Sequence, residues 1–360
     1  MRVLHSEKNT SYRIIFSNKI KEYIKKQSSK YKKIAVIADT NLWKHYGKEI
    51  GRKDILNIKI EPGERSKSIK TKNYIEDLLL KNNFNRNSLI IAIGGGVIGD
   101  LVGFTASTFM RGVALVHIPT SLIAIVDSSI GGKTAIDNKY GKNLIGTFYN
   151  PKEIIINLDF LKSLPNKEIR QGMAEIIKYS IIDSKSLFIS LNQINKQFLL
   201  NKKSITNQII KECIKIKIKT VESDFKESDK RMILNFGHTV GHALEKFYKY
   251  KKSHGDCIGF GMLVEAKIAN KINHLSSNEY HKIKELLNSY ELINLNIKKT
   301  NVKELLRYMR LDKKNLDSSV TFSLPKKIGS IIKTRGKHSI QIKDKIIIDS
   351  LNTVIDEIKN

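Results

Sequence analysis

The sequence predicts two domains: an α/β domain with a parallel sheet at the N-terminus and a mainly α-helical domain at the C-terminus. Up to about residue 160, short apolar runs alternate with amphipathic segments, which is typical of buried parallel strands covered by helices. From Pro165 onward, long segments with helical periodicity dominate. A length of 360 residues also favours two domains over one. We therefore expect domains at residues 1–160 and 161–360.

The chain carries an excess of positive charge. Its 64 Lys and Arg residues against 35 Asp and Glu residues give a net charge of +29, which is compatible with nucleic-acid binding. However, the lysines are spread along nearly the whole chain, Ile and Asn are also abundant, and the sequence contains no nucleic-acid-binding motif. We therefore expect no nucleic-acid partner, and part of the charge is available for an anionic small substrate.

Cysteine content and hydropathy indicate the cellular compartment. The sequence has two cysteines, Cys213 and Cys257, which are far apart and argue for a reducing compartment without disulfides. No apolar run approaches the ~18 residues needed to cross a bilayer, and the first residues lack the apolar region of a signal peptide. We expect a cytoplasmic protein without a membrane partner.

The first domain begins with strand-like and helix-like segments in alternation. TSYRIIFS (10–17) and KKIAVIADT (32–40) have the composition of strands, and the second ends at the polar residue Asp39. Residues 61–68, EPGERSKS, form a predicted turn before a helix at 71–83. These segments fit the first strand–helix units of a parallel sheet.

A glycine-rich segment follows the apolar run at 89–93. Gly94, Gly96 and Gly99 form a GxGxxG pattern between a predicted strand and a predicted helix, where bare backbone can approach a pyrophosphate. The pattern is weak alone, lies outside the first strand–helix unit, and has no acidic residue about 20 positions on. Asp39, at the end of an earlier strand, is the alternative partner for a ribose. We expect a Rossmann-like domain without the standard fingerprint.

The next apolar run, ALVHIP at 114–119, leads into a polar, glycine-rich stretch. Its Gly-Gly-Lys-Thr sequence is similar to the end of a P-loop, but Asp127 stands where a P-loop requires glycine, which disfavours a nucleoside triphosphate. Lys133 and Lys142 suit a phosphate or carboxylate ligand. A solvated loop is the alternative, because lysine is abundant in this chain. The run EIIINLDFL at 153–161 is the last predicted strand.

Three of the nine histidines lie between residues 235 and 255. His238 and His242 share one face of a predicted helix, and His254 follows in a glycine-flanked segment. Three nitrogen donors suit zinc or cobalt, whereas helix capping and packing are the alternative roles. A carboxylate is needed to complete such a site, and Glu175 is the candidate. Because Glu175 is three residues from Lys178 on a predicted helix, a surface ion pair is its alternative.

Eight sequence blocks together resemble the 3-dehydroquinate synthase family of sugar phosphate cyclases. In chain order they are GERSK, GGGVIGD, FMRG, PTSLIAIVDSSIGGKT, GKNLIGTFYNP, GMAEIIKY, LNFGHTVGHALE and SHG. The resemblance extends from about Asp39 to Lys314, and the combination is far more specific than any block alone. It implies conversion of 3-deoxy-D-arabino-heptulosonate 7-phosphate (DAHP) to 3-dehydroquinate and phosphate, in the shikimate pathway to aromatic amino acids.

The resemblance also implies the cofactors and the course of the reaction. Zinc or cobalt would be held by Glu175, His238 and His254, with His242 on the substrate side. Tightly bound NAD would oxidise the substrate at C5, phosphate would be eliminated, and the hydride would return before an aldol closure. NAD would thus act as a catalyst that is not consumed. The metal and the nicotinamide are expected to face each other across the boundary between the two domains.

Matching family positions imply the remaining site residues. The NAD-binding residues are Asp39, Pro62, Gly63, Glu64, Arg65, Ser66, Lys67, Gly95, Gly96, Val97, Ile98, Gly99, Asp100, Thr120, Ser121, Lys133, Lys142, Phe160, Leu161, Lys162 and Ser163. The catalytic residues are Lys133, His242, Lys178, Asn143 and Asp127. The substrate-binding residues are Lys142, Lys217, Arg231, Asn235, Arg111 and one of Lys313 and Lys314. Arg111 matches an arginine that reaches the neighbouring subunit's site, which implies a homodimer.

Two other activities share this scaffold. Cyclases that form inosose or valiolone rings act on substrates without a carboxylate, whereas Lys217 and Arg231 match positions suited to one. A metal-dependent polyol dehydrogenase would release NADH in every turnover. The complete set of blocks therefore favours 3-dehydroquinate synthesis.

Overall fold

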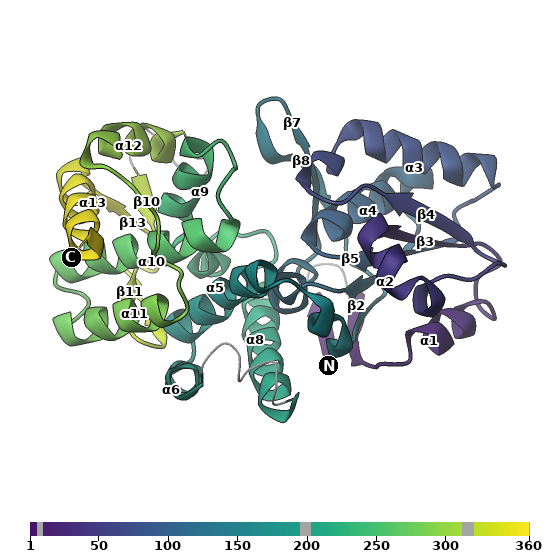
Figure 1. Ribbon diagram of the computed structural model, residues 1–360, viewed down its shortest axis with the longest axis horizontal. Helices are drawn as coiled ribbons and strands as arrows, with labels where there is room; N and C mark the ends of the chain where they lie inside the picture. Colours follow the sequence, from purple (N-terminus) through teal and green to yellow (C-terminus); the bar gives the residue numbers. More distant parts are fainter. Residues whose placement is uncertain (6–9, 195–202, 312–319, 360) are drawn as a thin grey trace. The chain divides into compact units, whose positions relative to one another are not determined.

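The computed structural model describes residues 1–5, 10–194, 203–311 and 320–359. The chain divides into two compact units, Met1–Pro165 and Asn166–Asn360 (Figure 1). Lys313 and Lys314, which the resemblance implies as substrate contacts, lie outside the described residues. In the part of the chain that the structure describes, no helix is long and apolar enough to span a bilayer.

The first unit is built on a seven-stranded sheet in which six neighbouring strands are parallel. Among the described strands, β1 runs antiparallel to its neighbour β2 at one edge. In spatial order the strands are β1 (Arg2–His5), β2 (Thr10–Phe16), β9 (Glu153–Ile156), β6 (Ala114–Pro119), β5 (Leu89–Gly94), β3 (Ile34–Asp39) and β4 (Leu56–Ile60). The parallel sheet confirms the fold class predicted for this part of the chain.

The central strands are apolar on both faces because helices cover both faces. In β3, Ala35 and Ile37 pack in one hydrophobic cluster, whereas Val36 and Ala38 pack in the other. Consecutive side chains of a strand point to opposite faces, so a continuous apolar run indicates burial on both. The covering helices are α1 (Ile20–Gln27), α2 (Thr40–Ile50), α3 (Ile69–Lys81) and α4 (Gly96–Thr108).

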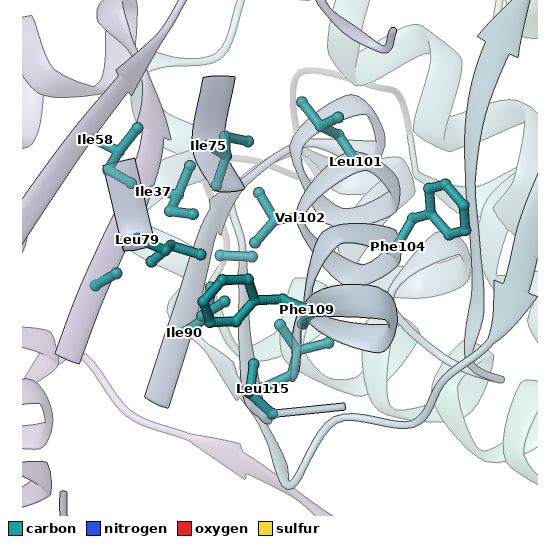
Figure 2. Packing of buried hydrophobic residues seen from close by; sticks show 14 of the residues in the cluster. Ile37, Ile58, Ile75, Leu79, Ile90, Leu101, Val102, Phe104, Phe109 and Leu115 are labelled. Carbon is teal, nitrogen blue, oxygen red and sulfur yellow. The ribbon is translucent and has the colours of Figure 1, made fainter. Parts of the chain in front are cut away.

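Helix α4 is held against the sheet by the larger of these clusters. Figure 2 shows Ile75 and Leu79 of α3 together with Val102 of α4, close to Ile37 and Ile90 of the sheet. Full burial of one such aliphatic side chain stabilises the fold by roughly 1.5–3 kcal/mol. The packing therefore fixes the start of α4, which carries the glycine pattern, at the carboxyl end of β5.

The strand order reverses between β3 and β5. From β3 the chain proceeds to β4 on one side, and from β5 it proceeds to β6 on the other. Ala38 of β3 is the register partner of Ile93 of β5, so Asp39 and Gly94 end neighbouring strands. In open α/β sheets, ligands bind outside the carboxyl ends of the strands at such a reversal. Asp39 and the glycine pattern thus share the ligand-binding edge of the sheet.

A β-hairpin follows β6 in the first unit. Its strands, β7 (Lys133–Asn138) and β8 (Gly141–Phe148), pair antiparallel. The solvated loop considered for this glycine-rich stretch is therefore not what the structure shows. A side chain at position 146 would lie 2.0 Å from the carbonyl oxygen of Thr134, so Gly146 permits the close pairing. The backbone N–H of Asp137 donates to the carbonyl of Lys67 at 2.8 Å, which ties the hairpin to the segment after β4.

The second unit is mainly helical, as predicted. Its helices are α5 (Asn166–Ile182), α6 (Lys185–Gln193), α8 (Lys203–Ser223), α9 (His238–Phe247), α10 (His254–Lys271), α11 (Ser277–Ser289), α12 (Val302–Arg310) and α13 (Asp344–Lys359). Two short antiparallel pairs join β10 (Val320–Phe322) with β13 (Ile340–Ile342) and β11 (Pro325–Lys327) with β12 (Ser330–Ile331). Helix α10 is buried along most of its length and packs against α5, α9, α11 and α13 (Figure 1).

Candidate functional site

The side chains of Glu175, His238 and His254 come together in the second unit. Their ligand atoms all lie within 4.8 Å of one another. Glu175 Oε1 is 3.5 Å from His238 Nε2 and 3.5 Å from His254 Nε2. Ligands held tetrahedrally about 2.1 Å from a zinc ion are about 3.4 Å apart. The distances are long for hydrogen bonds but match the edges of such a tetrahedron, so the three residues fit a divalent ion.

The position of each candidate ligand is set by its helix. Glu175 lies in the buried middle of α5 and is 1% exposed. His238 begins α9 directly after Gly237, whose φ of +80° is a left-handed conformation that favours glycine. His254 begins α10 after Ser253, whose hydroxyl accepts a backbone N–H of the first turn at 3.2 Å. The starts of two helices therefore fix both histidines.

The other ring nitrogens of the two histidines have acceptors. His238 Nδ1 lies 3.1 Å from the carbonyl oxygen of Phe236, and His254 Nδ1 lies 3.0 Å from Glu245 Oε1. An acceptor at Nδ1 holds the proton there and leaves the Nε2 lone pair for a metal. Both Nε2 atoms face Glu175 Oε1, so the tautomers suit metal binding.

His254 is also influenced by the carboxylates around it. Burial lowers the pKa of His254, but the carboxylates of Glu245 and Glu175 outweigh burial and raise this pKa to about 10. The metal-free imidazole is therefore protonated at neutral pH. A metal ion binds only the neutral form, so it must displace this proton.

His242 lies beside the group and outside it. Its ring meets the ring of His238 edge to face, with centroids 5.3 Å apart. Among the described residues, the group that could hold a metal consists of Glu175, His238 and His254. The residues that come together are thus those that the family resemblance implies as ligands. The HxxxH spacing alone instead suggests His238 and His242 as a ligand pair.

Lys178 is the hydrogen-bond partner of the second oxygen of Glu175. Its Nζ donates to Glu175 Oε2, and both residues are 1% exposed. The alternative of a surface ion pair is therefore wrong, because the pair is buried. A buried carboxylate requires a compensating charge. Lys178 provides that charge at Oε2, while Oε1 faces the histidines.

Arg231 is also fully buried, in the 3-10 segment η5 (Lys230–Asn235). Its Nη1 donates to the carbonyl of Phe225 at 2.6 Å, and its backbone N–H donates to Asp224 Oδ2 at 3.0 Å. Although burial raises the pKa of Asp224, backbone N–H donors from the following turn lower it to about 2. Asp224 therefore stays charged and anchors the segment that carries Arg231.

Two other residues implied as substrate contacts lie in the same unit. Lys217 is buried in α8, and Asn235 Nδ2 donates to Glu227 Oε1 at 3.0 Å at the end of η5. Asn235 is three residues before His238 and four after Arg231. Two candidate substrate contacts and one candidate metal ligand therefore lie in one short stretch of chain.

In the first unit, the glycine pattern forms the start of α4. Gly95 is the N-cap residue and provides no side chain to the helix. A Cβ at Gly95 would lie 3.2 Å from Ser121 Oγ, and the backbone N–H of Thr120 donates to the carbonyl of Gly94 at 3.0 Å. An uncapped helix start lined by backbone N–H and hydroxyl groups favours a phosphate. The N-terminal turn of α4 consists of Gly96, Val97, Ile98 and Gly99.

A cluster of charged residues adjoins this helix start. Lys67 Nζ donates to Asp100 Oδ2 at 2.5 Å and to Asn143 Oδ1. Burial raises the pKa of Asp100, whereas the ammonium groups of Lys67 and Lys133 oppose the rise. Lys142 Nζ lies 3.4 Å from Glu64 Oε1. Residues from the turn after β4, from α4 and from the hairpin are therefore brought together.

The remaining residues implied as NAD contacts have varied surroundings. Asp39 caps α2 by accepting the backbone N–H of Leu42 at 2.9 Å. Phe160 is buried and meets the ring of Tyr46 edge to face, while Ser163 Oγ lies 2.7 Å from Tyr46 Oη. The others are exposed (Pro62, Gly63, Arg65 and Lys162) or buried (Ser66 and Leu161). Asp127 lies in the π-helical segment η3 (Ala124–Ser128).

Sequence reasoning missed the residues that support the candidate ligands. Glu245, which contacts His254, lies seven residues after His238, two turns along the same helix face. That spacing is a signal in the block LNFGHTVGHALE. Asp224, which anchors the segment of Arg231, has no comparable signal, because its role depends on a turn that only the folded chain defines.

Comparison with known proteins places these features in a family. Two family models match, described as 3-dehydroquinate synthase N-terminal at residues 57–171 and 3-dehydroquinate synthase C-terminal at residues 172–315. The 3-dehydroquinate synthase of Clostridium beijerinckii is 42% identical over 308 residues, covering 83% of this chain and 87% of the relative. That of Pelagibacter ubique is 39% identical over 351 residues, covering 93% and 94%.

Solved structures share the fold at lower sequence identity. A 2-deoxy-scyllo-inosose synthase in complex with carbaglucose-6-phosphate, NAD+ and Co2+ matches with a TM-score of 0.85 at 23% identity, covering 99% of both chains. A 2-epi-5-epi-valiolone synthase from Streptomyces hygroscopicus with NAD+ and Zn2+ bound matches with a TM-score of 0.86 at 21% identity, covering 97% of this chain and 98% of that one.

Proposed function

The chain belongs to the 3-dehydroquinate synthase family, and we infer from this that it converts DAHP to 3-dehydroquinate and phosphate. The reaction comprises transient oxidation at C5, phosphate elimination, re-reduction and aldol cyclisation. It is a step of the shikimate pathway. The single observation that supports this function most directly is that Glu175, His238 and His254 come together in a chain of this family.

We propose that Glu175, His238 and His254 hold Zn2+ or Co2+. Support comes from the 3.5 Å separations around Glu175 Oε1 and from the Nδ1 acceptors that free both Nε2 atoms. A divalent ion held there would supply Lewis acidity toward the substrate hydroxyl at C5, and NAD would supply a reversible hydride acceptor. The protein's own residues orient the ligands, and Lys178 holds the Glu175 carboxylate through a hydrogen bond to Oε2.

We propose that the first unit binds NAD at the reversal point of its sheet. The start of α4, at Gly95 to Gly99, receives the pyrophosphate, and Asp39 receives the adenosine ribose. Lys67 orients Asp100 and Asn143 beside this helix start. The other proposed contacts are Pro62, Gly63, Glu64, Arg65, Ser66, Thr120, Ser121, Lys133, Lys142, Phe160, Leu161, Lys162 and Ser163.

We propose that cationic residues hold the two anionic groups of the substrate. DAHP carries a phosphate and a carboxylate, and both need charge-assisted hydrogen bonds when water is excluded. The cations are Arg231 and Lys217 in the second unit and Lys133 and Lys142 in the first. The other proposed neighbours of the substrate are Asn235, His242, Asn143 and Asp127, which offer hydrogen-bonding groups. The substrate's own phosphate takes the C6 proton, so these side chains position that phosphate.

The test of this function is phosphate release from DAHP with NAD present only in catalytic amounts. We expect many turnovers per NAD, formation of 3-dehydroquinate, no accumulation of NADH at 340 nm, and loss of activity with a chelator. Steady NADH build-up would instead identify a polyol dehydrogenase. Turnover of glucose 6-phosphate, which lacks a carboxylate, in preference to DAHP would identify an inosose-type cyclase.

We propose a homodimer in which Arg111 reaches the neighbouring site. Support comes from strand β8, where Leu144, Ile145 and Phe148 are 50%, 44% and 42% exposed. Large apolar side chains in a row on a surface strand favour contact with a second copy. Thr147 of the same strand donates to Ser107 at the end of α4, so β8 lies beside the segment that leads, four residues later, to Arg111.

Mixing two inactive variants tests the shared site. Arg111→Ala and His238→Ala should each be inactive alone, because each removes a different part of every site. In a mixed dimer, one site combines an intact His238 with the partner's intact arginine. Random exchange of subunits should therefore restore about a quarter of wild-type activity. Mixed dimers that form but stay inactive would show that Arg111 acts within its own chain.

We also propose a cytoplasmic location. The two cysteines, Cys213 and Cys257, are both free and buried, which suits a reducing compartment.

A further inference from the structure

Helix α9 begins without a side-chain cap of its own. Its N-cap residue is Gly237, which has no side chain to accept the N–H groups of the first turn. Unsatisfied N–H groups at a buried helix start are costly, and the first residue of this helix is His238. The position of a candidate metal ligand therefore depends on what satisfies these groups.

Glu265, from the neighbouring helix α10, accepts these N–H groups. Its Oε2 accepts the backbone N–H of Gly237 at 2.7 Å, and its Oε1 accepts that of Val240 at 3.2 Å. These are the N-cap and N3 positions, which a capping box satisfies with two side chains of the same helix. Here one carboxylate, 0% exposed, makes both hydrogen bonds from another helix. Its negative charge also lies at the positive end of α9.

The two helices are in contact through their backbones at this point. A Cβ on Gly261 of α10 would lie 2.1 Å from the carbonyl oxygen of Gly237. A Cβ on Gly241 of α9 would lie 2.5 Å from Ile258 Cδ1. Glycine at these positions brings the helices close enough for Glu265, one turn after Gly261, to reach the start of α9.

We propose that Glu265 is a positioning residue for the metal centre. Helix α9 begins with His238 and helix α10 begins with His254, so a carboxylate of α10 that binds the start of α9 ties the two histidine-bearing helices together. It acts through the backbone N–H groups of Gly237 and Val240, on either side of His238, and it is not one of the proposed ligands. This inference rests on the proposed metal centre.

The test measures metal affinity in Glu265→Gln and Glu265→Ala. Gln keeps the size of the side chain and one acceptor oxygen but loses the charge, whereas Ala leaves the N–H groups of Gly237 and Val240 without this acceptor. Competition of the folded protein with a chromophoric chelator for Zn2+ gives the dissociation constant. We expect Ala to weaken binding by about 10–100-fold, with Gln intermediate. The visible absorption of bound Co2+ should shift in both variants, because the ligand geometry changes.

Ser276→Ala is the matched control. Ser276 caps α11 in the same unit by accepting the backbone N–H of Glu279 at 3.2 Å, and it lies on neither histidine-bearing helix. Its loss should lower the melting temperature while leaving Zn2+ affinity and the Co2+ spectrum at wild-type values. If the Glu265 variants behave like this control, Glu265 is only a structural cap and the inference is overturned.

His238→Ala separates this inference from the metal centre itself. Wild-type affinity in His238→Ala would overturn the proposed ligand set. Loss of Zn2+ in His238→Ala, together with unchanged affinity in both Glu265 variants, would overturn the positioning role alone.

Discussion

His238→Ala is expected to lose its bound metal ion and to form 3-dehydroquinate at least about a thousandfold more slowly than the wild type. Metal ions contribute several kcal/mol of charge stabilisation, and each 1.36 kcal/mol corresponds to a tenfold change in rate. His238 Nε2 faces Glu175 Oε1 at 3.5 Å, so its removal leaves two of the three proposed protein ligands. Metal content after desalting and the rate of phosphate release measure the effect.

His281→Ala is the control for this substitution. His281 is exposed on α11, and its ring contacts the backbone of its own helix, so the variant should keep metal and activity. Glu175→Gln and His254→Ala should behave like His238→Ala. Retention of one metal ion per chain by the His238 variant would show that the ligand set is wrong.

The fold was predictable because its signal lies in short stretches of sequence. The run from Ile34 to Ala38 is apolar at every position, which indicates a strand buried on both faces, and β3 has this environment. The hairpin of β7 and β8 was missed, because glycine and lysine in this stretch also suit a loop. Its pairing depends on Gly146, whose close approach to Thr134 appears only in the folded chain.

The candidate site was harder to predict from residue patterns alone. Helical spacing connects His238 with His242, but it cannot connect either residue with Glu175, which is on another helix about 60 positions earlier. Residue types offered Glu175 only as a candidate carboxylate, with a surface ion pair as its alternative, and the family resemblance decided between the two. Spacing along α9 gave a signal for Glu245, but its contact with His254 and the contact of Glu265 with Gly237 join two helices, and packing between helices is not encoded in a local pattern.

Arg231→Ala is expected to raise the KM for DAHP by about 30-fold or more while the protein keeps its metal and NAD. Removing one partner of a buried charge pair costs about 2–5 kcal/mol, which corresponds to this change in affinity. Arg231 is fully buried, and its segment is anchored through its backbone by Asp224. Because that anchor does not use the side chain, the substitution should remove the guanidinium and preserve the segment.

Arg231→Lys and Arg335→Ala complete this experiment. Lysine keeps the charge but not the planar, two-pronged geometry that matches a carboxylate, so its KM should lie between those of the wild type and Arg231→Ala. Arg335 is exposed in the same unit, and its removal should leave the KM unchanged even though the net charge falls equally. Steady-state kinetics with DAHP measure all three variants. A wild-type KM in both Arg231 variants would exclude Arg231 from anion binding and leave Lys217 as the candidate in α8.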